Sequence, residues 1–112
     1  MAGAVMPRHP KSAPVKVAVL PLSRKEPLRE LSQSVYDTLR KHWDVQYDDA
    51  QSIGRRYRRQ DEVGTPLCVT IDFDSIVDHQ VTIRERDTME QTRLPIIDLV
   101  PDLQKRLTLP AN

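Results

Sequence analysis

Residues 52–74, SIGRRYRRQDEVGTPLCVTIDFD, predict a helix that leads directly into a strand. Ser52 is a suitable N-cap residue, and Gly64 and Pro66 are residues that end helices. In the second half of the segment, polar and apolar residues alternate, and the apolar ones are Leu67, Val69, Ile71 and Phe73. This period of two predicts a strand with one buried face.

Upstream of this segment the sequence predicts a strand, a helix and a second strand. Residues 15–22, VKVAVLPL, form an apolar run that favours a buried strand. Between about 26 and 41, apolar residues recur every three or four positions, as on one face of a helix. These residues are Leu28, Leu31, Val35 and Leu39. Trp43, Val45 and Tyr47 then alternate with polar residues, which predicts a half-buried strand at an edge of the sheet.

Downstream, a polar connection at 74–80 is followed by a strand at 81–86, which we expect to form a hairpin with 67–73. A short extended piece at 91–96 predicts a fifth strand, and Asp98 is expected to cap a final helix that ends near Leu107. This order of elements predicts an α/β domain, built as a mixed five-stranded sheet of three parallel strands plus antiparallel strands, with three helices.

The chain length and composition predict one domain at 13–107, with a flexible leader at 1–12 and a loose tail at 108–112. Seventeen Lys and Arg residues balance sixteen Asp and Glu residues, so the formal charge is only +1. That balance excludes a protein that coats nucleic acid nonspecifically, and any nucleic-acid site must be local. The longest apolar run, at 17–22, is too short to span a membrane.

The side chains that usually carry catalysis or bind metals are scattered. The three histidines, His9, His42 and His79, lie far apart and show no metal-ligand spacing. The single cysteine, Cys68, lies inside an apolar strand, where a thiol is usually inert, and it fits a reducing compartment such as the cytoplasm. Neither a nucleophile motif nor a glycine-rich phosphate loop occurs. We therefore expect no catalytic site, metal or cofactor in this chain.

Two arginine clusters are the residues best suited to bind an anion. Four arginines lie within 55–59, yet Arg58 is spaced to pair with Glu62 or Asp61, so a solvated ion-paired face and a nucleic-acid face both fit. In the second cluster, Arg84 and Arg86 are placed to share one face of a strand, about 7 Å apart. They could follow a nucleic-acid backbone or sandwich a base, or they could pair with Asp72 and Asp74 on the preceding strand.

Aromatic side chains offer a further way to bind bases. Trp43 and Tyr47 could stack on nucleobases, but the large side chains of a strand more often belong to the core, and we expect that role for both.

Four motifs occur in order over residues 13–103 and carry a family resemblance. APVKVAVLPL is followed by the pattern LxxLxxxVYDTLRK, then by SIGRRYRRQDEVGTP with CVTIDFD, and then by VTIRERDTMEQTRLPI. Together they resemble the C-terminal anticodon-binding domain of glycyl-tRNA synthetases, of the dimeric type. The resemblance implies the five-stranded mixed sheet with three helices that class II synthetases for glycine, histidine, proline and threonine share.

The resemblance also implies a partner, a glycine-specific tRNA whose anticodon stem-loop the domain contacts, with no role for DNA. The catalytic domain of the family, where ATP and magnesium bind, has no counterpart among these residues, so aminoacylation by this chain alone is not expected. The parent synthetase would be a homodimer, while the isolated domain would be a monomer. The alternative is a free-standing paralogue that serves as an accessory or protein-binding subunit, which an apolar patch at the 43–47 edge strand would favour.

An anticodon is a single-stranded loop whose bases stack on guanidinium planes and are recognised along their pairing edges. On this basis the expected base-recognition residues are Arg84, Glu85 and Arg86. The residues expected to contact phosphates or the loop are Gln51, Ser52, Arg55, Arg56 and Arg59. The helix N-terminus at Ser52 would itself favour a phosphate.

Overall fold

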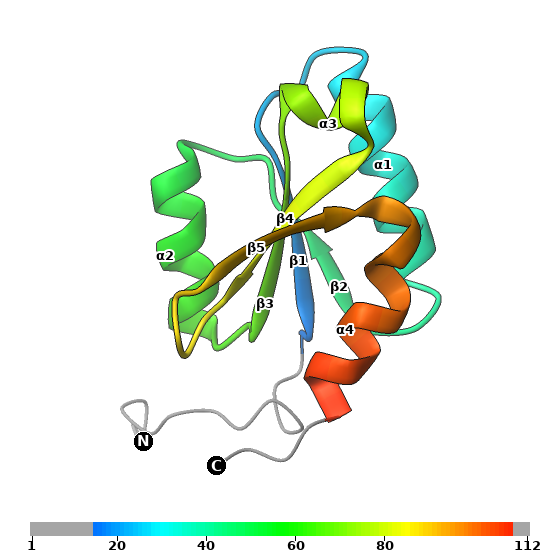
Figure 1. Cartoon of the computed structure of the whole chain (residues 1–112). Coiled ribbons are helices and arrows are strands. Elements are labelled where there is room, and N and C mark those ends of the chain that lie inside the picture. Colours follow the sequence, from blue (N-terminus) through cyan, green and yellow to red (C-terminus); the bar gives the residue numbers. More distant parts are fainter. Residues whose placement is uncertain (1–14, 109–112) are drawn as a thin grey trace.

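Strands and helices alternate along the chain in nearly the predicted order, in a computed structural model that describes residues 15–108 (Figure 1). The elements are β1 (Val17–Pro21), α1 (Leu28–Leu39), β2 (Val45–Tyr47), α2 (Ile53–Val63), β3 (Leu67–Ile71), α3 (Phe73–Asp78), β4 (Gln80–Glu85), β5 (Gln91–Pro95), the 3-10 helix η3 (Ile96–Asp98) and α4 (Leu99–Thr108). The leader expected at 1–12 and residues 109–112 of the expected tail lie outside the described residues.

The five strands form one sheet in the order β2-β1-β3-β4-β5. Strand β1 lies in the middle of the parallel part and pairs in parallel with both β2 and β3. Strand β4 is antiparallel to β3, and β5 is antiparallel to β4. The sheet confirms the predicted mix of three parallel strands with antiparallel ones, and it confirms β2 as an edge strand.

Local sequence signals set both ends of helix α2. The Ser52 hydroxyl accepts a hydrogen bond from the Arg55 N–H at 3.3 Å, which satisfies one of the free donors of the first turn. Gly64 follows the last helical residue with φ of 85°, a left-handed conformation that costs glycine little. The predicted N-cap and stop are confirmed.

Helix α3 occupies the segment that we expected to be a polar connection. The Asp72 carboxylate accepts from the Ser75 N–H at 3.0 Å, and the Ser75 hydroxyl accepts from the Asp72 N–H at 3.1 Å. This reciprocal cap starts a helix at Phe73, which therefore leaves the sheet and is 59% exposed instead of buried. The described chain thus has four α-helices, not three, and β3 joins β4 through a helix rather than a hairpin loop.

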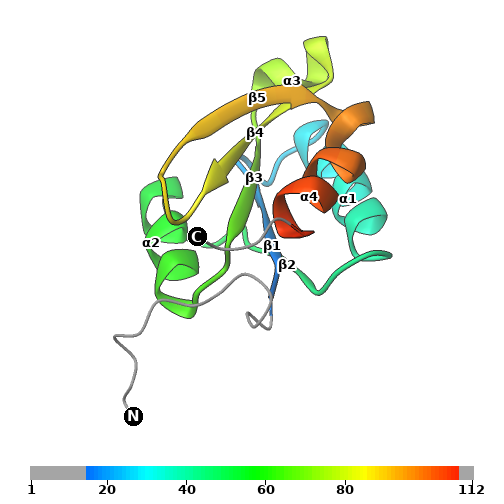
Figure 2. The same cartoon turned by 60° about the horizontal axis from the view of Figure 1, so that its bottom comes forward.

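The helices divide between the two faces of the sheet. Helices α1 and α4 cover one face, and α2 alone lies against the other (Figures 1 and 2). The larger core lies under α1 and α4, and its fully buried members include Val17, Val19, Leu28, Leu39, Val69, Ile71, Ile83 and Leu103. The α2 side has a small apolar cluster of Ala18, Leu20 and Cys68, against which Ile53 and Tyr57 pack. Helix α2 therefore relies on polar contacts for much of its attachment.

Trp43 and Tyr47 confirm the prediction that they belong to the core. Both are partly buried and pack against the larger core, and Tyr47 meets Tyr36 edge to face at a ring distance of 5.7 Å. The edge strand therefore does not present these rings as an apolar patch.

Candidate nucleic-acid interface

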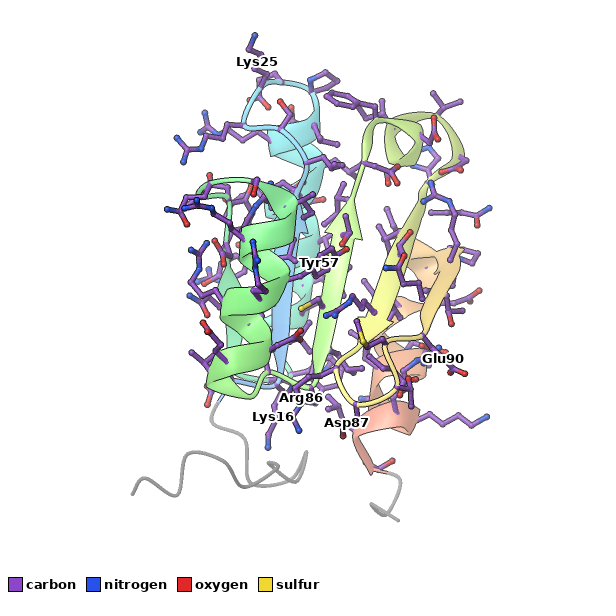
Figure 3. The ribbon with its side chains drawn as sticks, turned by 90° about the vertical axis from the view of Figure 1, so that its left-hand side faces the viewer. Lys16, Lys25, Tyr57, Arg86, Asp87 and Glu90 are labelled. Atoms are coloured by element: carbon purple, nitrogen blue, oxygen red, sulfur yellow. The ribbon has the colours of Figure 1, made fainter. Side chains whose placement is uncertain are left out.

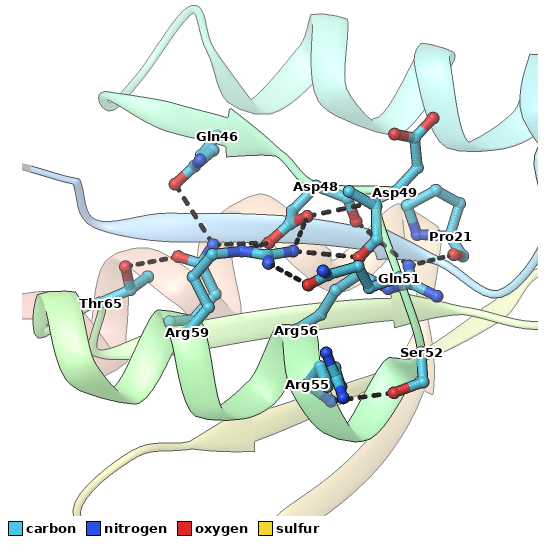
Figure 4. Close-up of polar contacts among 12 residues, drawn as sticks. Pro21, Gln46, Asp48, Asp49, Gln51, Ser52, Arg55, Arg56, Arg59 and Thr65 are labelled. Atoms are coloured by element: carbon cyan, nitrogen blue, oxygen red, sulfur yellow. Dashed lines mark hydrogen bonds and ion pairs between the residues drawn. The ribbon is translucent and has the colours of Figure 1, made fainter.

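A buried carboxylate, Asp48, holds the inner side of helix α2 to the end of β2 (Figure 4). Asp48 is 5% exposed and receives two hydrogen bonds from Arg59, at 2.7 and 3.0 Å, and one from the Gln60 amide at 2.9 Å. Burial alone would raise the pKa of Asp48, but these donors and the Ala50 N–H together lower it. Arg59, expected to contact phosphate, is thus engaged inside the domain.

Arg56 is also turned inward. It is 4% exposed, and its Nη1 atom donates to the main-chain carbonyls of Pro21 and Asp48. Burial lowers the pKa of this guanidinium. The side chain fastens the first turn of α2 to the ends of β1 and β2.

The outward face of α2 carries Arg55 and Arg58. Both are exposed, and neither forms an ion pair with another residue of 15–108. The predicted pairing of Arg58 with Glu62 or Asp61 is therefore wrong. These residues line a shallow surface depression together with Gln51, Arg59 and Glu62. Gln51 accepts a hydrogen bond from Arg59 at 2.9 Å, and Ser52, the helix cap, is exposed beside it.

Arg84 lies beneath α2 instead of facing solvent. It is 6% exposed, donates to both carboxylate oxygens of Asp61 at 3.0 and 3.2 Å, and sits 4.7 Å from the centre of the Tyr57 ring. The Asp61 hydrogen bonds raise the pKa of Arg84. Of the two alternatives left open for this arginine, the pairing with Asp72 does not form, because Asp72 binds Arg93 at 3.0 Å.

Glu85 and Arg86 lie at the end of β4. The Glu85 carboxylate forms an ion pair with Arg106 of α4, on the opposite face of the sheet from Arg84. Arg86 pairs with Asp87 at 2.8 Å, and its side chain is 14% exposed. Base recognition by these residues stays a prediction, and Glu85 would have to leave its present partner to contact RNA.

The structure divides the predicted site residues between the two ends of α2. Gln51, Ser52 and Arg55 lie at its first turn, whereas Arg86 lies near its last (Figure 3). The Arg86 N–H donates to Pro66 just beyond the helix, at the end opposite to Lys25. Eleven helical residues span about 16 Å, so the two groups form separate surfaces.

A family model described as "Anticodon binding domain" matches residues 16–106. The chain belongs to this family. It is 60% identical over 95 residues to a glycine–tRNA ligase of Corynebacterium glutamicum, and 56% identical over 103 residues to that of Geobacillus thermodenitrificans. These matches cover 85% and 92% of this chain but only 21% and 22% of the two ligases.

The fold of this anticodon-binding domain recurs in a solved prolyl-tRNA synthetase of Cryptosporidium parvum, with a TM-score of 0.84 and 27% identity. That match covers 93% of this chain and 23% of the synthetase. The predicted family and fold class are confirmed, and the chain spans about a fifth of the length of its curated relatives.

Across residues 15–108, no three His, Cys, Asp or Glu side chains gather as metal ligands. None of the helices described is both long and apolar enough to cross a membrane.

Proposed function

We propose that this chain binds tRNA as the anticodon-recognition domain of a glycine–tRNA ligase. The observation that carries the proposal is the match of nearly the whole domain to glycine–tRNA ligases at 52–60% identity. Aminoacylation, with its ATP and magnesium, would belong to the larger part of such a ligase, outside the fifth that this chain matches. The parent enzyme would act in the cytoplasm as a homodimer, and this domain would contribute recognition of the RNA.

The charge distribution on helix α2 supports a local RNA-binding surface. The two carboxylates closest to its inner side, Asp48 and Asp61, are each bound by an arginine. Arg55 and Arg58 therefore project outward without a carboxylate partner in the described chain, and Glu62 is the one acidic residue that lines the same depression. Two exposed arginines on one face of the helix are suited to bind the phosphates of an RNA loop.

The proposal is tested by titrating the chain with glycine tRNA and with an anticodon-swapped variant, at about 50 and 200 mM salt. We expect preference for the native anticodon. Arg55→Ala and Arg58→Ala should each weaken both RNAs and reduce the slope of log K against log salt by about 1. Arg40→Ala is the matched control, because Arg40 is 60% exposed at the end of α1, on the other side of the sheet. Equal binding of both RNAs, or equal effects of all three variants, would refute the proposal.

A second candidate, a subunit that acts through protein contacts, is favoured by apolar side chains near α3. Phe73, Val77 and Ile97 are 59%, 83% and 87% exposed. Phe73 and Val77 are four residues apart on α3 and so share one face of that helix, and adjoining exposed apolar side chains are typical of protein-contact surfaces. This alternative predicts self-association of the chain that Val77→Lys abolishes in sedimentation velocity, without any effect on RNA binding. Monomeric wild-type chain that binds tRNA would refute it.

A further inference from the structure

A hollow of about 240 Å³ lies where β1 and β2 end and α2 begins. Its lining residues are Pro21, Leu22, Ser23, Arg24, Asp49, Gln51 and Arg56. The hollow therefore lies at the carboxyl ends of two parallel strands, the edge of an open α/β sheet at which ligands bind.

Arg56 is the lining residue that indicates a ligand in the hollow. Its guanidinium is buried, yet both of its hydrogen bonds come from Nη1 and go to neutral carbonyls, those of Pro21 and Asp48. The Nε–H group is fully buried and has no acceptor among the described residues (Figure 4). A buried cation without a carboxylate in contact is costly. Its Nη2 group makes no hydrogen bond to a described residue and is not fully enclosed, so an anion in the hollow that accepts from Nη2 would offset that cost.

The first turn of α2 begins just after Gln51, which lines the hollow. The first N–H groups of a helix have no carbonyl partners within it, and the helix dipole favours negative charge near them. This helix end therefore makes the potential near the hollow more positive.

The net charge of the hollow is positive. Arg24, whose side chain is 67% exposed, donates to the Asp49 carbonyl at 3.1 Å and lies 3.7 Å from the Asp49 carboxylate. This contact leaves Arg56 as the cation that no carboxylate balances by direct contact. Asp49 is the one acidic residue in the lining, and its pairing with Arg24 balances part of its charge.

We propose that this hollow is a phosphate-binding subsite, in which Arg56 Nη2 and Arg24 hold a phosphate of an RNA backbone beside the positive end of α2. The identity of the RNA rests on the proposed function, whereas the anion chemistry does not. The sequence predicted Arg56 as one of several residues that contact phosphates or the anticodon loop. Here it acts from within, as the buried floor of the subsite.

The test uses the enclosed Arg56 Nε–H group as a reporter of an anion bound at the Nη2 group of the same guanidinium. In chain labelled with 15N-arginine, its side-chain cross-peak is identified by its loss in Arg56→Lys. The labelled chain is titrated with an anticodon stem-loop RNA and, separately, with sodium phosphate at constant ionic strength. We expect both to shift this cross-peak, and in uniformly 15N-labelled chain we expect the Gly54 amide to shift with it.

A second readout uses variants that keep the core intact. Arg24→Ala should lower the slope of log K against log salt by about 0.7 to 0.9, the loss of one phosphate contact, while Arg40→Ala should leave the slope unchanged. The two arginines are matched, because their side chains are 67% and 60% exposed and each has one aspartate partner.

The outcomes separate the two proposals. RNA that binds without moving the Arg56 cross-peak, and with an unchanged slope in Arg24→Ala, would overturn the subsite and leave the proposed function standing. Inorganic phosphate that moves the cross-peak, when RNA fails to bind, would support the subsite and refute the tRNA function. No shift with either ligand would overturn the subsite.

Discussion

Replacing Arg84 with alanine removes a buried guanidinium from between strand β4 and helix α2. The side chain is 6% exposed and makes two charge-assisted hydrogen bonds to Asp61 while it stacks on Tyr57. If Arg84 holds the helix in place, its loss lowers stability. If it recognises bases, its loss lowers the selectivity of RNA binding.

The size of the stability loss follows from these contacts. The carboxylate of Asp61 is 34% exposed, so it regains water when Arg84 is removed, and the ion pair contributes about 1–2 kcal/mol, between the values for exposed and buried pairs. The contact with the Tyr57 ring adds about 0.5–1 kcal/mol, and the buried alkyl stem adds about 1 kcal/mol. We expect Arg84→Ala to destabilise the domain by about 2.5–4 kcal/mol. Arg84→Lys keeps the charge but cannot form the bidentate contact with Asp61, and it should lower the free energy of unfolding by about half as much.

The assay is urea unfolding of the wild type, Arg84→Ala, Asp61→Ala and the double variant. The double-mutant cycle should give a coupling energy of about 1–2 kcal/mol between the two residues. Titration of the folded variants with cognate and anticodon-swapped tRNA completes the test. The reasoning is refuted if Arg84→Ala stays within about 0.5 kcal/mol of the wild type while it loses discrimination between the two RNAs.

Three further predictions concern the fold. The pKa of Asp48 lies below its value of 3.8 in the unfolded chain. The stability that the ionised carboxylate contributes is therefore present above about pH 4 and is lost as the pH falls through the folded-state pKa. Asp48→Asn should weaken this pH dependence of the unfolding free energy, measured by urea titrations between about pH 2 and 6. Burial raises the pKa of Cys68 to about 12, so iodoacetamide at pH 8 should leave the native thiol unmodified and react after unfolding in urea; fast native labelling would contradict this. Gly64→Ala should cost at least about 1 kcal/mol in thermal or urea unfolding, because Gly64 has φ of 85°, and an unchanged midpoint would contradict the left-handed helix stop.

The sequence predicted those features of the fold that depend on neighbouring residues. The limits of α2 follow from a serine cap and a glycine stop that act within four residues of the helix ends, and the structure has both. Helix α3 was missed although its signal was present. Asp72 and Ser75 have the spacing of a reciprocal cap, but the apolar alternation that continues to Phe73 favoured a longer strand.

The partners of the arginines could not be predicted in the same way, because they are distant in sequence. Arg84 lies 23 residues from Asp61, and Arg56 lies 35 residues from Pro21. The local rule for helix pairs favoured Arg58 with Asp61 or Glu62, yet packing of β4 against α2 placed Arg84 closer to Asp61. Which carboxylate an arginine meets is decided by strand order and helix placement, and neither is encoded in a five-residue window.

Because of this packing, a cluster of arginines in the sequence does not by itself show which of them can bind a ligand. Four arginines within residues 55–59 appear in the sequence as one basic patch, but helical periodicity turns Arg56 inward and directs Arg59 to Asp48. Only Arg55 and Arg58 remain on the outer surface without a carboxylate partner in the described chain. Arg56 and Arg59 therefore hold the helix against a sheet face that has only a small apolar cluster. Of the four arginines, Arg55 and Arg58 are therefore the ones that can bind a ligand on the outer face, and Arg56 can meet one only from within the hollow at the start of α2.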